Sequence, residues 1–301
     1  MPVGAAPPLN RAGVVGLGVM GGAIARNLLA SGSTVVGHDI DVGRLKAFAA
    51  AGGRPVGSAR DVVEQSDVVL LVLPSGAALD AATVGPGGLV EGARSGVTII
   101  EMSTLALEDK LRLRDRLEPL GAAVLDCPIS GTGVQAEKGD IVIYASGDEA
   151  AIEACRGILA ATSRDVIRVG PYGAGSRMKY LANLLVAIHV AAAAEALALA
   201  RRAGVDPEFA VGVLSSGAGT SRMLELRGPM MATRRYAPAA MALRLFEKDL
   251  DVIGAFGDSV SASLPLFATA AGLFRAAIAR GFGDLDTSSV HEALVAGEAD
   301  L

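Results

Sequence analysis

Two polar residues one helical turn apart could carry proton chemistry near the middle of the chain. Lys179 and Asn183 lie in GPYGAGSRMKYLANLL (170–185), where a glycine-rich turn runs into an alanine-rich stretch. Residues four apart on a helix differ by about 40° around its axis, so both side chains share one face. Lys179 supplies a titratable amine, and Asn183 supplies an amide with a donor and an acceptor. The pattern predicts that Lys179 acts as a general acid or base.

The choice of basic residues strengthens that prediction for Lys179. Of the 27 basic residues, 22 are Arg and five are Lys, namely Lys46, Lys110, Lys138, Lys179 and Lys248. A chain that uses Arg for general surface charge has a reason to place a compact, deprotonatable amine inside a motif. A genomic preference for Arg would produce the same bias, so the composition favours the role without establishing it.

A second set of residues, close to the start, has the spacing of a dinucleotide-binding turn. Gly16-Leu17-Gly18-Val19-Met20-Gly21 follows an apolar strand at 12–16 and precedes a helix at 23–30. The first glycine permits the turn, the second lets a pyrophosphate approach the backbone, and the third lets helix and strand pack closely. The helix N-terminus offers unpaired N–H groups to the phosphates. A glycine-rich turn that binds nothing is the alternative.

Asp39 ends the next predicted strand, 18 residues after Gly21. A carboxylate at this position predicts a hydrogen bond to the ribose diol of adenosine, and its charge disfavours a 2′-phosphate, so we expect NAD rather than NADP. Alternatively, Asp39 caps the following helix, a role that Asp41 can also fill. Arg44 could shield a phosphate, which leaves NADP as the less favoured cofactor.

A third loop, Asp126-Cys127-Pro128-Ile129-Ser130-Gly131-Thr132-Gly133, is rich in glycine and hydroxyl groups. Its backbone N–H groups and the hydroxyls of Ser130 and Thr132 could hold a small carboxylate of the substrate. An ordinary surface turn explains the same residues equally well.

The order of strands and helices predicts how these residues are positioned. Apolar strands at 34–37, 67–73, 97–100, 124–126, 141–145 and 166–169 alternate with helices such as 58–65 and 107–120, which indicates a parallel sheet buried on both faces. From residue 186 onward only helices are expected, at 243–260, 264–279 and 288–296. We therefore predict an α/β protein with a flexible tail (1–10), an NAD-binding, doubly wound Rossmann-type domain (11–169) and an all-helical domain (170–301) that begins with a long interdomain helix.

Composition disfavours several other classes of protein. A net charge of −5 gives no basic field for nucleic acid or an anionic membrane. Cys127 and Cys155 imply no disulfide framework, which suits the cytoplasm, and no Cys/His cluster has metal-ligand spacing. The apolar run 184–200 is interrupted by His189 and Glu195, so it predicts a buried helix rather than a membrane span. Its small alanine side chains favour close helix packing, and we expect a homodimer or homotetramer.

Taken together, four motifs resemble the β-hydroxyacid dehydrogenase family. They are GLGVMGGAIARNL (16–28), DCPISGTGVQAEKG (126–139), GPYGAGSRMKYLANLL (170–185) and FEKDLDVI (246–253). The family includes 3-hydroxyisobutyrate, L-threonate and glyoxylate/succinic-semialdehyde enzymes, and the resemblance spans almost the whole chain. It implies an NAD-dependent oxidoreductase that moves a hydride between the nicotinamide and a small β-hydroxy acid.

The resemblance also assigns roles to matching positions. Lys179 matches the catalytic lysine, and Asn183 matches the residue that orients the substrate and that lysine. Ser130, Gly131 and Thr132 match the loop for the substrate carboxylate. The matching cofactor positions are Gly16, Leu17, Gly18, Met20, Gly21, Asp39, Leu73, Pro74, Thr104 and Lys248.

This chain departs from the family pattern at two places in the carboxylate loop. Thr132 replaces the second glycine of the usual Ser-Gly-Gly, and Gln135 stands at another position that is usually glycine. Both changes bear on the choice of substrate, and segments 219–227 and 281–290 are closer to the threonate branch.

Three rival functions remain open. Imine reductases share the architecture but typically replace the catalytic lysine. A decarboxylating enzyme of the 6-phosphogluconate type carries a longer helical domain. A non-catalytic dinucleotide-binding scaffold has no need for Lys179 and Asn183 together.

Overall fold

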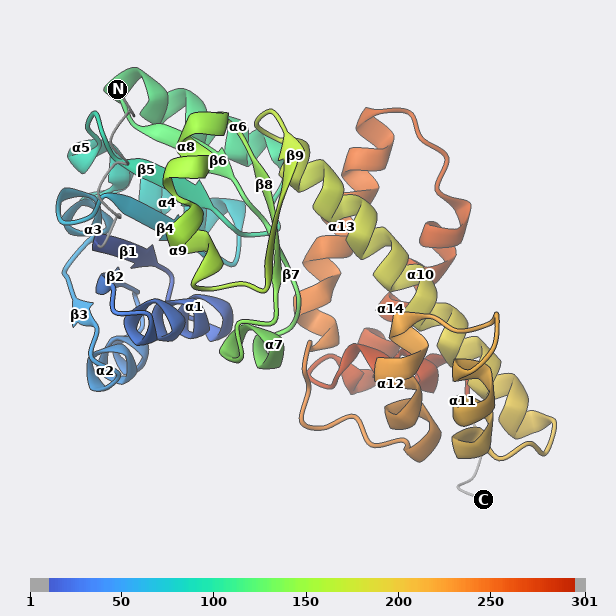
Figure 1. Cartoon of the computed structure of the whole chain (residues 1–301). Coiled ribbons are helices and arrows are strands. Elements are labelled where there is room, and N and C mark those ends of the chain that lie inside the picture. The colour runs from blue at the N-terminus through green and yellow to red at the C-terminus, as the bar shows by residue number, and fades with distance from the viewer. Residues whose placement is uncertain (1–10, 296–301) are drawn as a thin grey trace, which may run out of the picture. The chain divides into compact units, whose positions relative to one another are not determined.

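The computed structural model describes residues 11–295; the predicted flexible tail, 1–10, lies outside the described residues, as do 296–301. The chain forms two compact units that divide along the sequence between Lys179 and Tyr180. In Figure 1 the first unit contains a sheet with helices, and the second contains helices only.

Nine strands of the described chain form one sheet in the first unit. They are β1 (Arg11–Val15), β2 (Thr34–His38), β3 (Arg54–Pro55), β4 (Val68–Leu71), β5 (Thr98–Glu101), β6 (Ala123–Asp126), β7 (Ile129–Ser130), β8 (Val142–Ser146) and β9 (Asp165–Gly170). Their order is β3-β2-β1-β4-β5-β6-β8-β7, with β9 paired to β8. The first six strands in this order run parallel, as in a doubly wound dinucleotide-binding sheet. The predicted α/β class and Rossmann-type sheet are confirmed.

The sheet is buried on both faces, as the apolar strands predict. Val14 and Leu70 belong to one buried cluster, whereas their chain neighbours Val15 and Leu71 belong to another. Because successive side chains of a strand point to opposite faces, these clusters lie on opposite sides of the sheet. The packing helices are α1 (Val19–Ala30), α2 (Val42–Ala50), α3 (Ala59–Glu64), α4 (Gly76–Val84), α5 (Leu89–Gly92), α6 (Leu107–Leu117), α7 (Gly133–Glu137), α8 (Glu149–Ala154) and α9 (Arg156–Ala160), with a 3₁₀ turn at Glu118–Leu120.

The edge of the sheet beyond β6 differs from a purely parallel arrangement. β8 runs antiparallel to β6 and β7 and parallel to β9. An apolar strand has the same composition in either direction, so the sequence pattern does not distinguish the two orientations. The change of direction at β8 does not affect the parallel pairing of β3, β2, β1, β4, β5 and β6.

The second unit is all-helical, which confirms the predicted class of this part of the chain. α10 (Ala174–Arg202) begins before the division and continues through it. It is followed by α11 (Pro207–Ser215), α12 (Arg222–Thr233), α13 (Leu243–Ser259), α14 (Pro265–Ala277), a π-helical turn (Ile278–Phe282) and a 3₁₀ helix (Thr287–Ala293). Tyr180 packs against Phe256 with 5.1 Å between ring centroids, in a core that also contains Phe246 and Phe274.

α10 is the one helix of residues 11–295 that is long and apolar enough to cross a membrane. Forty-four per cent of its most apolar window is buried inside the fold, where its alanine residues contact the core of the second unit. A core helix of a globular protein meets the same length and composition test, and this packing favours that interpretation.

Candidate active site

The glycine turn after β1 has the close contacts that the motif requires. Gly16 has φ +92°, and a Cβ atom there would lie 2.2 Å from the Val72 carbonyl oxygen. A Cβ atom on Gly21 would lie 1.9 Å from the carbonyl oxygen of Gly16. Gly18 precedes α1 and has no side chain to cap its first N–H groups. The turn therefore keeps the backbone open to an anion at a helix N-terminus, which fits the pyrophosphate of a dinucleotide.

Asp39 is held beside this turn rather than at the start of α2. Asp41 caps α2 and accepts a hydrogen bond from the Arg44 backbone at 3.1 Å, so the alternative role for Asp39 is not needed. Asp39 instead accepts hydrogen bonds from the backbone N–H groups of Leu17 at 2.7 Å and Asp41 at 2.8 Å. The Arg44 guanidinium lies 3.4 Å from the same carboxylate. Asp39 thus joins the end of β2 to the glycine turn.

The strands that carry the candidate nucleotide residues end at one edge of the sheet. Val15 pairs with Leu71, and Leu71 pairs with Glu101, so the loops after β1, β4 and β5 leave the sheet side by side. Leu73 donates its backbone N–H to the Ser103 hydroxyl at 2.8 Å, which ties two of these loops together. Leu73, Pro74 and Thr104 therefore lie at the carboxyl edge, where dinucleotides bind in this fold.

The loop that the sequence predicts to hold the substrate carboxylate, 126–133, leads into the short helix α7. Gly131 has φ +150°, and a Cβ atom there would lie 2.7 Å from a methyl group of Ile141. Thr132 caps α7 by accepting from the Gln135 backbone at 3.4 Å, and Gln135 Oε1 accepts from the Thr132 backbone at 3.0 Å. This is a capping box, in which the two residues satisfy each other's N–H groups. Both departures from the family pattern therefore serve the same local structure.

Lys179 and Asn183 lie one turn apart on α10, and both are buried, with 8% and 6% of their surface exposed. In the second unit, Asn183 Nδ2 donates to Oδ2 of Asp249 at 2.8 Å. Lys248 Nζ donates to Oδ1 of the same carboxylate at 2.7 Å. Asp249 therefore joins two of the predicted site residues. Asp249 lies in the FEKDLDVI motif, so the sequence pointed to this segment, but the motif alone did not assign Asp249 a role.

A buried ionic cluster in the first unit was not predicted. Lys110 has no exposed surface, and its Nζ lies 2.6 Å from Glu101 Oε2 and 2.8 Å from Asp126 Oδ1. A signal was present in α6, because Lys110 falls on the stripe formed by the buried residues Leu107, Leu113 and Leu117. A lysine on an apolar stripe needs a charged partner inside the fold.

The electrostatics of this cluster keep the lysine charged. Burial disfavours the ammonium form, but the carboxylates of Asp126 and Glu101 outweigh it and raise the pKa of Lys110 above its ordinary value. Burial raises the pKa of Glu101, against the opposing effect of Lys110. The cation therefore stays between the two acids throughout the neutral range.

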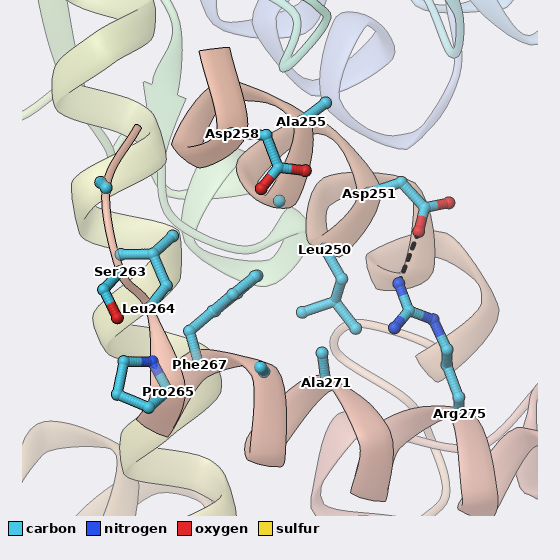
Figure 2. Close-up of a pocket in the computed structure, with 13 residues that line it drawn as sticks. Leu250, Asp251, Ala255, Asp258, Ser263, Leu264, Pro265, Phe267, Ala271 and Arg275 are labelled. Carbon is cyan, nitrogen blue, oxygen red and sulfur yellow. Dashed lines mark hydrogen bonds and ion pairs between the residues drawn. The ribbon is translucent and has the colours of Figure 1, made fainter. Parts of the chain in front are cut away.

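A separate pocket of about 590 Å³ lies between α13 and α14 of the second unit. Figure 2 shows Phe267, Leu250 and Ala271 lining the pocket, and Asp251 paired with Arg275. The atoms of this ion pair are 2.7 Å apart. None of the site residues predicted from the sequence lines it. The pocket is therefore distinct from the candidate catalytic set.

The fold and these residues define a nicotinamide-dinucleotide-dependent oxidoreductase with a separate helical unit. The model for the NAD-binding domain of 6-phosphogluconate dehydrogenase matches residues 11–170. The model described as NAD-binding of NADP-dependent 3-hydroxyisobutyrate dehydrogenase matches residues 173–294. The chain belongs to the β-hydroxyacid dehydrogenase family.

Individual relatives agree with this assignment over nearly the full length. The chain is 36% identical to L-threonate dehydrogenase of Cupriavidus necator, over 92% of this chain and 94% of that protein. It is 31% identical to 2-hydroxy-3-oxopropionate reductase of Escherichia coli, over 94% and 96%. A crystal structure of 3-hydroxyisobutyrate dehydrogenase from Salmonella typhimurium superimposes with a TM-score of 0.83 at 32% identity, covering 94% of this chain and 99% of that one. The protein is thus an NAD(P)-dependent hydroxyacid dehydrogenase, as the motifs predicted.

Proposed function

We propose that this enzyme oxidises a small β-hydroxy acid of the L-threonate type, with NAD as the preferred cofactor and Lys179 as the general base. The observation that carries the proposal is the burial of Lys179 on α10, immediately after the strand that completes the dinucleotide-binding sheet. A protein that only bound the dinucleotide would gain nothing from a desolvated amine there.

The residues of the chain divide the work of the reaction. Bound NAD⁺ supplies the hydride acceptor. Lys179, as the neutral amine, takes the hydroxyl proton of the substrate while the carbon–hydrogen bond breaks, and it returns that proton to the oxygen in the reverse direction. Ser130, Gly131 and Thr132 form the loop that holds the substrate carboxylate, with the Ser130 hydroxyl as its side-chain donor, and Asn183 fixes the orientation of the reacting carbon.

The proposed cofactor residues lie in the first unit, except for Lys248, which the family resemblance adds. The glycine turn, with Leu17 and Met20, receives the pyrophosphate, and Asp39 accepts from the ribose diol. Leu73, Pro74 and Thr104 line the nucleotide at the carboxyl edge of the sheet. Because Arg44 lies beside Asp39 and can shield a 2′-phosphate, NADP is the less favoured alternative cofactor.

The substrate class follows from two observations. L-threonate dehydrogenase is among the relatives above 30% identity, and Thr132 and Gln135 replace glycine residues in the carboxylate loop. Larger side chains in this loop are expected to change which acid fits. We further propose that the enzyme acts in the cytoplasm as a homodimer or homotetramer, on the basis of its cysteine usage and the alanine-rich stretch of α10.

The test is a substrate panel followed by NADH absorbance. L-threonate, 3-hydroxyisobutyrate, 2-hydroxy-3-oxopropionate, succinic semialdehyde and a cyclic imine are compared with NAD(H) and NADP(H). Turnover of L-threonate with NAD⁺ at the highest kcat/KM supports the proposal. Reduction of the imine alone, or binding of NADH without consumption, would overturn it.

Lys179→Ala tests the role of the lysine. We expect kcat to fall by about 10²–10⁴, the usual contribution of a general acid or base, while NADH binding persists. Lys46→Ala is the matched control, because Lys46 is an exposed lysine of the same unit. Near-normal turnover of Lys179→Ala would remove the lysine from the mechanism.

A further inference from the structure

The first turn of α10 is tied to the sheet by hydrogen bonds that it donates to the buried side chains of Asp126 and Ser146. Ser176 donates its backbone N–H to Asp126 Oδ2 at 2.8 Å and its hydroxyl to Asp126 Oδ1 at 2.9 Å. Gly175 donates its backbone N–H to the Ser146 hydroxyl at 2.9 Å, and that hydroxyl donates to the Asp126 carbonyl oxygen at 2.8 Å. Asp126 at the end of β6 therefore acts as a cap for α10 from a distant part of the chain.

The backbone of Gly175 packs closely against the residues around the ends of β6 and β8. A Cβ atom on Gly175 would lie 2.6 Å from the carbonyl oxygens of Asp126 and Tyr144 and 2.9 Å from a carbon of Pro128. The helix thus begins in close contact with the chain after β6 and with β8, at a distance that leaves no space for a side chain at position 175. Lys179 lies three residues after Ser176, within the next turn of the same helix.

The cluster around Lys110 explains how Asp126 stays in place. Glu101 and Asp126 are register partners at the ends of β5 and β6, so their carboxylates are brought together inside the fold. Two buried like charges repel strongly unless a cation lies between them. Lys110 supplies that cation from α6, and Tyr172, two residues before α10, donates its hydroxyl to the Lys110 carbonyl oxygen at 2.8 Å. The same cluster therefore contacts both the strand ends and the approach to the helix.

We propose that Asp126, held by Lys110 and Glu101, is a positioning residue for Lys179. It fixes the first turn of α10 and thereby the position of Lys179, one turn further along, relative to the ends of β6 and β8. The proposal rests on the proposed role of Lys179 and adds the group that sets its geometry. A shift of about 1 Å in a reacting group can cost on the order of 10² in rate, so the anchor affects turnover without touching the substrate.

Ser176→Ala tests the anchor with the least disturbance, because it removes one hydroxyl and keeps the backbone bond to Asp126. We expect kcat for the best acid of the substrate panel to fall about tenfold, with KM for NAD⁺ within about twofold of the wild type. Asp126→Asn, which places an amide against Ser176 and Lys110, is expected to lower kcat further. Thr83→Val is the matched control, since Thr83 is a buried residue of α4 in the same unit whose hydroxyl makes one hydrogen bond, to Leu79.

A double-mutant cycle separates positioning from general stability. If Asp126 and Ser176 act through Lys179, then Ser176→Ala causes no further loss of the residual rate in a Lys179→Ala background. An equal loss in both backgrounds, an unchanged kcat in Ser176→Ala alone, or an equal loss in Thr83→Val overturns the inference. Failure of the proposed function looks different, because Lys179→Ala itself would then retain turnover.

Discussion

Asn183 donates a hydrogen bond from Nδ2 to Oδ2 of Asp249 at 2.8 Å. A carboxylate only accepts, so this contact fixes which end of the amide faces Asp249 and directs the Asn183 carbonyl oxygen away from it. The other oxygen of Asp249 accepts from Lys248. One carboxylate therefore sets the orientation of an amide and the position of a cation, both of which the sequence predicted as site residues.

Asp249→Asn should disturb that orientation without removing volume. The new side chain can donate as well as accept, so the Asn183 amide loses its single preferred orientation. We expect kcat/KM for the hydroxy acid to fall about tenfold, which corresponds to roughly 1.4 kcal/mol. Steady-state kinetics measure the change. Asp251→Asn, two residues further along α13 in an exposed ion pair, should leave kcat/KM unaltered, and an equal effect of both variants would contradict the prediction.

Asp39→Ser should shift the cofactor preference toward NADP. The substitution removes the charge that repels a 2′-phosphate and leaves Arg44 beside the vacated position. We expect kcat/KM for NAD⁺ to fall by about 10–100-fold, because a buried acceptor for the ribose is lost, while kcat/KM for NADP⁺ rises. Since Asp39 also accepts from Leu17 and Asp41, thermal stability should decrease as well. A variant that still prefers NAD⁺ by the wild-type ratio would exclude Asp39 from cofactor selection.

Ser130→Ala and Thr132→Ala should have different effects. The Thr132 hydroxyl caps α7, so its loss should lower the free energy of unfolding by about 1 kcal/mol and change KM for the acid by less than about threefold. The hydrogen bonds of that capping box do not involve Ser130. We expect Ser130→Ala to raise KM by roughly tenfold with little effect on stability. Urea unfolding and initial rates separate the two, and a reversed pattern would mean that the Thr132 hydroxyl, rather than the Ser130 hydroxyl, binds the carboxylate.

The buried thiols predict how stability depends on alkaline pH. Burial raises the pKa of Cys155 to about 11 from an ordinary value of 9.0, against a small opposing hydrogen bond from Thr98. Burial also raises the pKa of Cys127. Between pH 9 and about 11 the unfolded chain loses a thiol proton that the folded chain keeps, so stability is present below pH 9 and decreases as the pH rises.

Urea unfolding at pH 8, 9 and 10 measures this effect, with a loss of up to about 1.4 kcal/mol per pH unit for each thiol. Cys155→Ala should make the free energy of unfolding fall less steeply with pH, because one of the two thiols is gone. The cavity left by the substitution lowers the free energy of unfolding by the same amount at every pH. An identical slope in the variant would show that other groups cause the alkaline loss.

The sequence was sufficient for the parts of the molecule that depend on local spacing. Gly16, Gly18 and Gly21 specify the turn, Asp39 follows at the expected distance, and α10 carries Lys179 and Asn183 on one face. The family motifs and the α/β architecture are confirmed by the comparisons and the sheet topology. The individual roles of these residues stay predictions until the variants are measured.

The remainder depends on contacts between residues far apart in the chain. Asn183 and Asp249 are 66 residues apart, and Asp126 and Ser176 are 50 apart, so no periodicity links them. The direction of β8 is likewise decided by its partners, β6, β7 and β9. The start of α7, in contrast, could have been predicted, because Thr132 and Gln135 have the sequence spacing of a capping box.

The buried trio of Glu101, Lys110 and Asp126 also constrains how this sequence can diverge. Loss of Lys110 leaves two carboxylates without a cation inside the fold, at a cost of about 3–5 kcal/mol, which is a large part of the stability of a typical domain. Loss of one acid instead leaves Lys110 paired with the other. Replacement of all three by apolar residues avoids the charge penalty but removes the carboxylate that accepts from Ser176. Descendants of this gene are therefore expected to retain Lys110 for as long as both acids are present, so that substitutions at the three positions show strong epistasis.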